Sequence, residues 1–104
     1  MAKGYWIVSV EVSDPAQYAQ YVSANAAAFS KYGARFLVRG GAHTIEEGAG
    51  LARNVVIEFK DYATALACYD SSEYQHAITF RAGAAKANIL VIDGYDGPQP
   101  KENA

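Results

Sequence analysis

The sequence predicts an α+β fold in which four antiparallel strands form one sheet and the helices cover one of its faces. Four segments alternate apolar and mixed positions with the two-residue period of a strand. The stretches after the first and third of these carry apolar residues at three- and four-residue spacing, which indicates amphipathic helices. The expected strands are residues 4–12, 34–40, 53–59 and 88–95.

Each expected helix begins at a residue that accepts hydrogen bonds from free backbone N–H groups. Asp14 and Asp61 supply N-cap oxygens for the helices that follow the first and third strands. Ser72 and Gln75 have capping-box spacing, so we expect a further short helix to start there. Gly33 suits the position just after a helix C-terminus and should end the first helix.

The order β, α, β, β, α, β is the split βαβ pattern, and right-handed crossovers place the first and third strands at the centre of the sheet. One face of each strand should then pack under the helices. The residues expected on this face are Trp6, Val8, Val10, Phe36, Val38, Val55, Ile57, Phe59, Leu90 and Ile92. The residues expected to face away are Tyr5, Ile7, Ser9, Glu11, Arg35, Leu37, Arg39, Asn54, Val56, Glu58, Ile89, Val91, Asp93 and Tyr95.

The face directed away from the helices predicts a homodimer. A monomer would expose Ile7, Leu37, Val56 and Val91 as one apolar patch, which soluble monomers usually avoid. A second copy whose sheet faces the first would cover it. Residues 1–97 should form one domain with a core thin enough to benefit from a partner, and residues 98–104 a polar C-terminal tail.

Composition excludes several classes of function. The net charge is −2 and basic residues do not cluster, so we expect no nucleic-acid partner. No apolar run reaches the roughly 20 residues of a membrane span, and the N-terminus lacks a signal-peptide core, so we expect a cytoplasmic protein and no membrane partner. The single cysteine, Cys68, cannot form an internal disulfide and is expected to be a packed helix residue.

Seven residues are candidates for a functional site. If the mixed sheet face lines a sheltered space between two subunits, Arg39 and Glu58 would project into it, where a guanidinium binds a carboxylate or enolate and a glutamate acts as a base. The candidates for ligand binding are Arg39, Arg53, Glu73, Tyr74 and Arg81, and those for proton transfer are Glu58 and His43. In the alternative interpretation, Arg53 or Arg81 forms a structural ion pair across the subunits with Glu58, Glu73 or Asp93.

The histidines and tyrosines give weaker signals. His43 lies in a loop bracketed by glycines and would enter a cavity if that loop closed. Neither His43 nor His76 stands at a metal-ligand spacing from another ligand, so we expect no metal and no cofactor. Five tyrosines at helical spacing are expected to form the edge of the core with solvated hydroxyls: Tyr18, Tyr21, Tyr32, Tyr62 and Tyr69.

Several stretches resemble the uncharacterised family called domain of unknown function 1330, which belongs to the dimeric α+β barrel group. The similar stretches are YWIVSVEVSDP, ARFLVRGG, EEG, RNVVIEF, SSEYQHAITFR and ILVIDG, between residues 4 and 97. One departure is Ser72, where the family commonly has proline. The resemblance implies a ferredoxin-like fold and dimerisation. Its structural relatives range from cofactor-free monooxygenases and lactone isomerases to haem enzymes, so it implies no single activity.

Two functions therefore remain as expectations. The first is a homodimeric protein that binds a small organic acid or carbonyl compound between sheet and helices, either as a binding protein or as a cofactor-free enzyme of isomerase or monooxygenase type. The second is a non-catalytic dimeric assembly or stress-related module without a ligand pocket.

Overall fold

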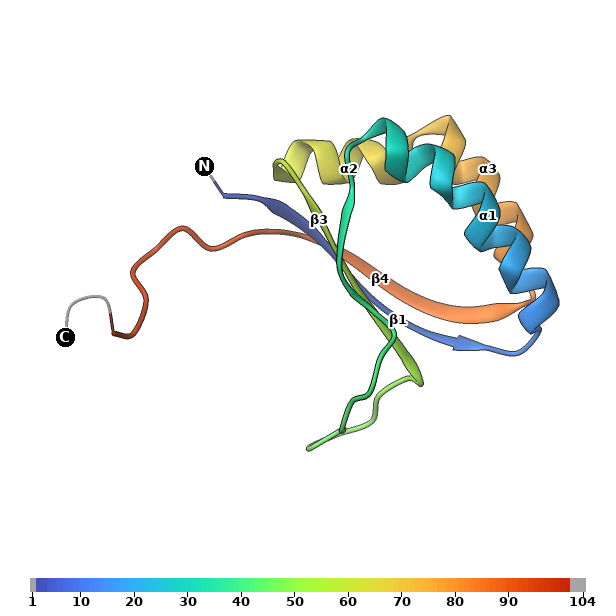
Figure 1. Ribbon diagram of the computed structural model, residues 1–104, viewed down its shortest axis with the longest axis horizontal. Coiled ribbons are helices and arrows are strands. Elements are labelled where there is room, and N and C mark those ends of the chain that lie inside the picture. Colours follow the sequence, from blue (N-terminus) through green and yellow to red (C-terminus); the bar gives the residue numbers. More distant parts are fainter. Residues whose placement is uncertain (1, 102–104) are drawn as a thin grey trace.

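The computed structural model describes residues 2–101, in which four strands form one antiparallel sheet with the helices on one face (Figure 1). The elements are β1 (Gly4–Val12), α1 (Pro15–Lys31), β2 (Arg35–Arg39), β3 (Arg53–Phe59), α2 (Tyr62–Asp70), α3 (Ser72–Arg81) and β4 (Ala85–Asp93). The strand order β2-β3-β1-β4 places β3 and β1 at the centre. The expected α+β fold and its central strands are confirmed.

The start of α1 is tied to the end of α3. Asp14 Oδ1 accepts a hydrogen bond from the backbone N–H of Gln17 at 3.1 Å, as an N-cap should. The Gln17 amide turns the other way and donates to the backbone oxygens of Phe80 and Ala82, at 3.0 and 2.9 Å. At the far end, Gly33 has φ +67°, which suits glycine, and ends the helix where expected.

The two shorter helices are also capped by side chains. Asp61 Oδ1 accepts from the backbone N–H of Thr64 at 2.8 Å at the start of α2. The cap of α3 is Ser71, whose Oγ accepts from the backbone N–H of Tyr74 at 3.1 Å, whereas Ser72 is the first helical residue. The capping position expected at Ser72 is therefore wrong by one residue, because the preceding serine reaches the free N–H groups first.

Trp6 lies at the centre of the core between the sheet and the helices. Its Nε1 donates to the backbone oxygen of Ala65 at 2.9 Å, so the indole loses no hydrogen bond on burial. Edge-on contacts join its ring to Phe29 and Tyr74, with centroids 5.3 and 4.9 Å apart. This aromatic cluster fixes the distance between β1 and the layer formed by α1 and α3.

The face assignment expected for the last strand is wrong. In the register of β4 with β1, Val91 lies opposite Trp6 and packs against the core together with Ile89. Leu90 and Ile92 lie on the other face and are 50% and 45% exposed. Because four consecutive residues of this strand are apolar, both of its faces are suited to burial, and the pairing with β1 decides which face is buried.

A β-bulge in β2 reverses a second assignment. Phe36 lies opposite Ile57, but the next registered pair is Val38 with Val56, so β2 contains one extra residue. Beyond the bulge, Arg39 pairs with Val55, whose side chain is buried under the helices. Arg39 therefore faces the helices and Val38 faces away, the reverse of the expectation.

The outer sheet face, meaning the sheet surface away from the helices, carries several exposed apolar side chains. They are Ile7, Leu37, Val38, Leu90 and Ile92, each between 42% and 50% exposed. Val91, expected in this patch, belongs to the core instead. None of the helices within residues 2–101 has the length and apolarity needed to cross a membrane.

Two segments project from the body of the fold. The loop of residues 40–52 extends beyond the sheet on one side, and residues 94–101 extend beyond the end of β4 on another (Figure 1). The radius of gyration is accordingly 15.1 Å, compared with about 13 Å for a compact domain of this length.

Candidate functional site

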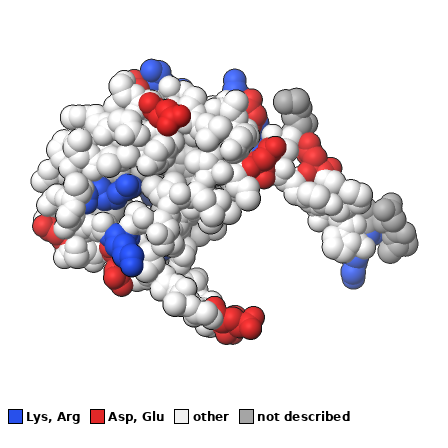
Figure 2. Space-filling model, turned by 180° about the vertical axis from the view of Figure 1, so that it is seen from behind, with Lys and Arg blue, Asp and Glu red and all other residues white. Residues whose placement is uncertain are grey.

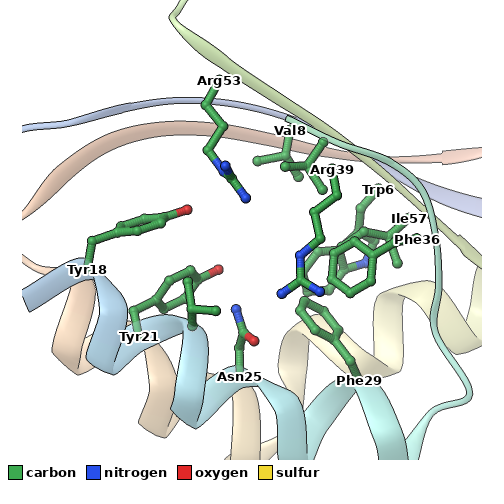
Figure 3. A pocket seen from close by; sticks show the side chains of 12 residues that line it. Trp6, Val8, Tyr18, Tyr21, Asn25, Phe29, Phe36, Arg39, Arg53 and Ile57 are labelled. Atoms are coloured by element: carbon green, nitrogen blue, oxygen red, sulfur yellow. The ribbon is translucent and has the colours of Figure 1, made fainter. Parts of the chain in front are cut away.

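A cleft opens between the sheet and α1, on the side of the sheet that the helices cover. Its walls come from β1, α1, β2 and β3, and most are aromatic or aliphatic (Figure 3). The lining residues are Trp6, Val8, Tyr18, Tyr21, Val22, Asn25, Phe29, Phe36, Arg39, Arg53, Val55 and Ile57. The empty volume, including the part open to solvent, is about 390 Å³, and a water-sized sphere can be centred in about 40 Å³ of it.

Arg53 extends from the start of β3 into this cleft (Figure 3). Its Nε is buried and has no hydrogen-bond partner among residues 2–101. The guanidinium lies against Gly40, where a Cβ would come within 3.0 Å of Nη1 and φ is +71°. Because glycine has no Cβ, Gly40 leaves room for the Arg53 guanidinium. A buried guanidinium N–H without an acceptor lowers the stability of the fold, and an acceptor supplied by a bound molecule would remove that cost.

Arg39 enters the same cleft because of the bulge in β2. Its guanidinium carbon lies 4.1 Å from the centroid of the Phe36 ring, a cation–π contact that holds the side chain at the cleft's mouth. Within the described part of the chain, no carboxylate forms an ion pair with Arg39 or Arg53. Basic side chains border a hollow on the rear face of the molecule in Figure 2. Two unpaired cations in a largely apolar cleft favour an anion.

Asn25 and Tyr18 add polar groups to the cleft. Asn25 is 6% exposed, and its amide points into the hollow without a side-chain hydrogen bond to any residue of the described range (Figure 3). Burial raises the pKa of Tyr18, while Arg53 and Arg81 act in the opposite direction. Tyr18 is thus neutral at physiological pH and lies within electrostatic reach of both arginines.

Behind the cleft wall, two tyrosines and an arginine form a hydrogen-bonded cluster. The hydroxyls of Tyr21 and Tyr74 are 2.6 Å apart, and Arg81 Nη1 donates to them at 3.3 and 3.1 Å. Burial, together with the neighbouring Tyr21, raises the pKa of Tyr74 well above its ordinary value. Burial alone would lower the pKa of Arg81, but Tyr74 and Tyr21 raise it. The cluster therefore holds two neutral phenols beside a permanent cation.

The remaining candidates lie elsewhere. Glu58 is on the outer sheet face, where Tyr5 donates to its Oε2 at 3.2 Å. His43 is exposed in the loop of residues 40–52, and Glu73 forms an exposed ion pair with Lys31 at 3.0 Å on the helix layer. Arg39 and Glu58 thus occupy opposite faces of the sheet, and the expectation that they share one is wrong.

The structure brings Arg39 and Arg53 together and places Arg81 and Tyr74 behind them. Within one subunit, Arg81 binds tyrosine hydroxyls rather than a carboxylate. Sequence reasoning had not selected Asn25, Tyr18 and Tyr21 as site residues, since their helical spacing is also that of a core edge. The available signal was Asn25, an amide in an otherwise apolar stripe of α1.

No three histidine, cysteine, aspartate or glutamate side chains gather closely enough to hold a metal ion in the range that the structure describes. The polar groups of the cleft are guanidinium, amide and phenol groups. They suit an oxyanion far better than a cation.

Comparison with solved structures finds the same fold at low sequence identity. A protein of unknown function from Rhodopseudomonas palustris has a TM-score of 0.69 and 14% identity, over 92% of this chain and 85% of its own. SnoaB, a cofactor-independent oxygenase from Streptomyces nogalater, has a TM-score of 0.58 and 12% identity, over 97% and 100%. A dimeric ferredoxin-like protein of unknown function from Thermobifida fusca has a TM-score of 0.53 and 16% identity, over 88% and 91%.

These likenesses establish a ferredoxin-like α+β fold, as the resemblance implied. No curated protein matches the chain. The model of the family described as a domain of unknown function, DUF1330, matches residues 3–95, and the chain belongs to this family.

Proposed function

We propose that this protein is a homodimer that binds a small, partly aromatic organic anion in the cleft of each subunit. One observation carries the proposal: two guanidinium groups enter an apolar cleft without a carboxylate partner in the described chain, and one of them has a buried, unpaired Nε. A ligand carboxylate would accept from both arginines and satisfy that N–H.

The walls of the cleft narrow the ligand class. Trp6, Phe29 and Phe36 offer ring faces and edges, so an aromatic or flat apolar group suits the interior. The enclosed part of the cleft is small, since a water-sized sphere can be centred in only about 40 Å³ of it and the rest of the hollow is open to solvent. A single ring bearing an acid group fits this space better than a nucleotide or a polycyclic compound.

The outer sheet face supports dimerisation. Its five exposed apolar residues lie on the surface opposite the cleft, and a second copy that packs sheet against sheet would cover them. The ferredoxin-like protein from Thermobifida fusca is dimeric. In this arrangement each subunit keeps its own cleft, and the partner's sheet supports the strands that carry Arg39 and Arg53.

A cofactor-free oxygenase or isomerase is a second candidate, favoured by the fold shared with the Streptomyces oxygenase. In such an enzyme the arginines would stabilise an enolate oxygen of the bound acid. Glu58 and His43 are proposed for proton transfer there. Both lie outside the cleft of their own subunit, so either would need the dimer or a movement of the loop of residues 40–52 to reach it.

Thermal unfolding with matched ligands tests the binding proposal. Benzoate carries the charge and benzamide is its neutral analogue of the same shape. Benzoate should raise Tm with the logarithm of its concentration once this exceeds the Kd, and a ligand at 100 times its Kd stabilises by about 2.7 kcal/mol. Benzamide, or chloride at equal ionic strength, should not.

Variants locate the site and separate the candidate functions. Arg39→Met and Arg53→Met should each abolish the benzoate shift, whereas Lys3→Met, an exposed cation outside the cleft, should keep it. If no aromatic or aliphatic acid stabilises the wild type beyond the chloride control, the alternative of a dimeric assembly without a ligand site is correct.

A further inference from the structure

The hydroxyl of Tyr21 joins the cleft to the cluster behind it. Tyr21 lines the cleft, and its oxygen points into the hollow between Arg53 and Asn25 (Figure 3). The same oxygen contacts the Tyr74 hydroxyl at 2.6 Å and Arg81 Nη1 at 3.3 Å. Tyr74 is fully buried and does not line the cleft.

Counting donors and acceptors fixes the direction of the short bond between the two tyrosines. Arg81 donates to both oxygens and accepts from neither. In the described chain, the only acceptor within hydrogen-bond distance of the Tyr74 proton is the Tyr21 oxygen. If Tyr21 donated instead, the buried Tyr74 proton would have no acceptor, which is costly. Tyr74 therefore donates to Tyr21.

This direction leaves the proton of Tyr21 without a protein acceptor. The Tyr21 oxygen accepts from Tyr74 and from Arg81, so its own O–H is directed to the remaining open side, which is the cleft. Arg81 also places a positive charge behind this hydroxyl, with its guanidinium carbon 5.0 Å from the centroid of the Tyr21 ring. A phenol polarised in this way is a strong hydrogen-bond donor.

We propose that Tyr21 donates a hydrogen bond to a second oxygen of the bound acid, so that the substrate class is an aromatic acid with a carbonyl oxygen close to its carboxylate, such as a 2-oxo acid. This rests on the proposed function, because it assumes that the arginines hold the carboxylate. Arg53 and Tyr21 approach the same hollow from β3 and α1, with Tyr18 beside both (Figure 3). Tyr74 and Arg81 donate to the Tyr21 oxygen from behind, and neither accepts its proton, which is left for the ligand.

Two ligands isolate this contact. Phenylpyruvate and 3-phenylpropionate share the ring, the chain length and the carboxylate, and differ in the 2-oxo oxygen. Isothermal titration of the wild-type protein should give a Kd about five- to tenfold lower for phenylpyruvate, the effect of one hydrogen bond in a sheltered site. Tyr21→Phe should bind both acids equally, with the Kd for 3-phenylpropionate unchanged.

Two further variants keep the test independent of folding. Tyr21→Phe alone leaves the buried Tyr74 hydroxyl without an acceptor and destabilises the fold, whereas Tyr21→Phe with Tyr74→Phe removes both hydroxyls together and should restore stability. The double variant should also lack the preference for the oxo acid. Tyr74→Phe alone retains the Tyr21 proton and should keep it.

The outcomes separate this inference from the proposed function. If the wild type binds both acids equally, or if Tyr21→Phe retains the preference, the role of Tyr21 is refuted while the arginine site stands. A preference that is absent from the wild type but appears in Tyr74→Phe refutes the assigned direction of donation, because a Tyr21 proton donated to Tyr74 would be released to the cleft when that acceptor is removed. If neither acid binds the wild type, the proposed function fails and this inference with it.

Discussion

Replacing Arg53 by methionine should stabilise the empty protein while abolishing anion binding. The guanidinium occupies an apolar cleft with its Nε buried and unpaired in the described chain. Leaving a buried polar group without a partner costs about 1–3 kcal/mol, and exchanging buried charged groups for apolar ones of similar size is often neutral or stabilising. Because part of the Arg53 side chain is exposed, we expect the lower part of that range, about 1 kcal/mol.

Urea unfolding measures this gain. It should be done at one fixed protein concentration, because the proposed dimerisation would make the midpoint depend on concentration. A gain of 1 kcal/mol corresponds to roughly 4–8 °C in Tm for a domain of about this size. Lys3→Met, which removes an exposed cation outside the cleft, is the matched control and should leave the free energy of unfolding unchanged within about 0.5 kcal/mol.

The opposite sign would refute the reasoning. If Arg53→Met loses more than about 1 kcal/mol relative to the lysine control, Arg53 has a structural partner in the assembled protein, and the ion pair across subunits becomes the correct interpretation.

A second perturbation reaches Arg53 without changing it. Gly40→Ala places a Cβ against the Arg53 guanidinium, whereas Gly41→Ala meets open space, and φ is positive at both positions. Both changes should cost about 1–2 kcal/mol in backbone strain. Only Gly40→Ala should also weaken benzoate binding.

Three further outcomes are expected. Ile7 lies on the outer sheet face, and Ile7→Glu should convert the proposed dimer into a species of 11.2 kDa in light scattering. Leu66 is an exposed apolar residue on α2, and Leu66→Glu should leave the dimer intact. An Ile7→Glu variant that remains dimeric would contradict the proposed interface. Burial raises the pKa of the Cys68 thiol to about 12, so it should react with a thiol reagent at pH 8 only after unfolding, and fast labelling of the native protein would show exposure. Hydrogen bonds from Thr64 lower the pKa of Asp61 below its ordinary 3.8, so the contribution of Asp61 to stability is complete above pH 3.8 and is lost as the pH falls through the folded pKa. Asp61→Asn keeps the helix cap and should reduce the loss of stability at acid pH. If that loss is unchanged in Asp61→Asn, Asp61 is not its source.

The fold could be predicted because its signals are local. Period-two alternation marks β1 and β3 with their observed ends, and the capping aspartates Asp14 and Asp61 mark where α1 and α2 begin. The last strand shows where local signals fail. Its apolar run satisfies either face, and only long-range pairing with β1 selects Ile89 and Val91 for the core.

The residues that line the candidate cleft could be predicted only in part. Arg39 and Arg53 were selected as cations in strands. The sheet face to which Arg39 points, however, depends on a β-bulge that the residue types of β2 do not predict. Asn25 and Tyr21 were not selected because residues at helical spacing on one face of a helix are as typical of core packing as of a binding site. Their place in the cleft depends on what β3 and α3 bring opposite them, which is a tertiary relation.

The extra residue in β2 connects two properties of the molecule through one short strand. It lets Arg39 point toward the helices while Leu37 and Val38 stay on the opposite surface. Deleting one residue there would restore plain alternation, move the Arg39 cation from the cleft to the outer sheet face, and turn an aliphatic side chain toward the helices. The proposed anion site and the proposed contact between subunits are therefore coupled at this strand, so an insertion or deletion here would change both together.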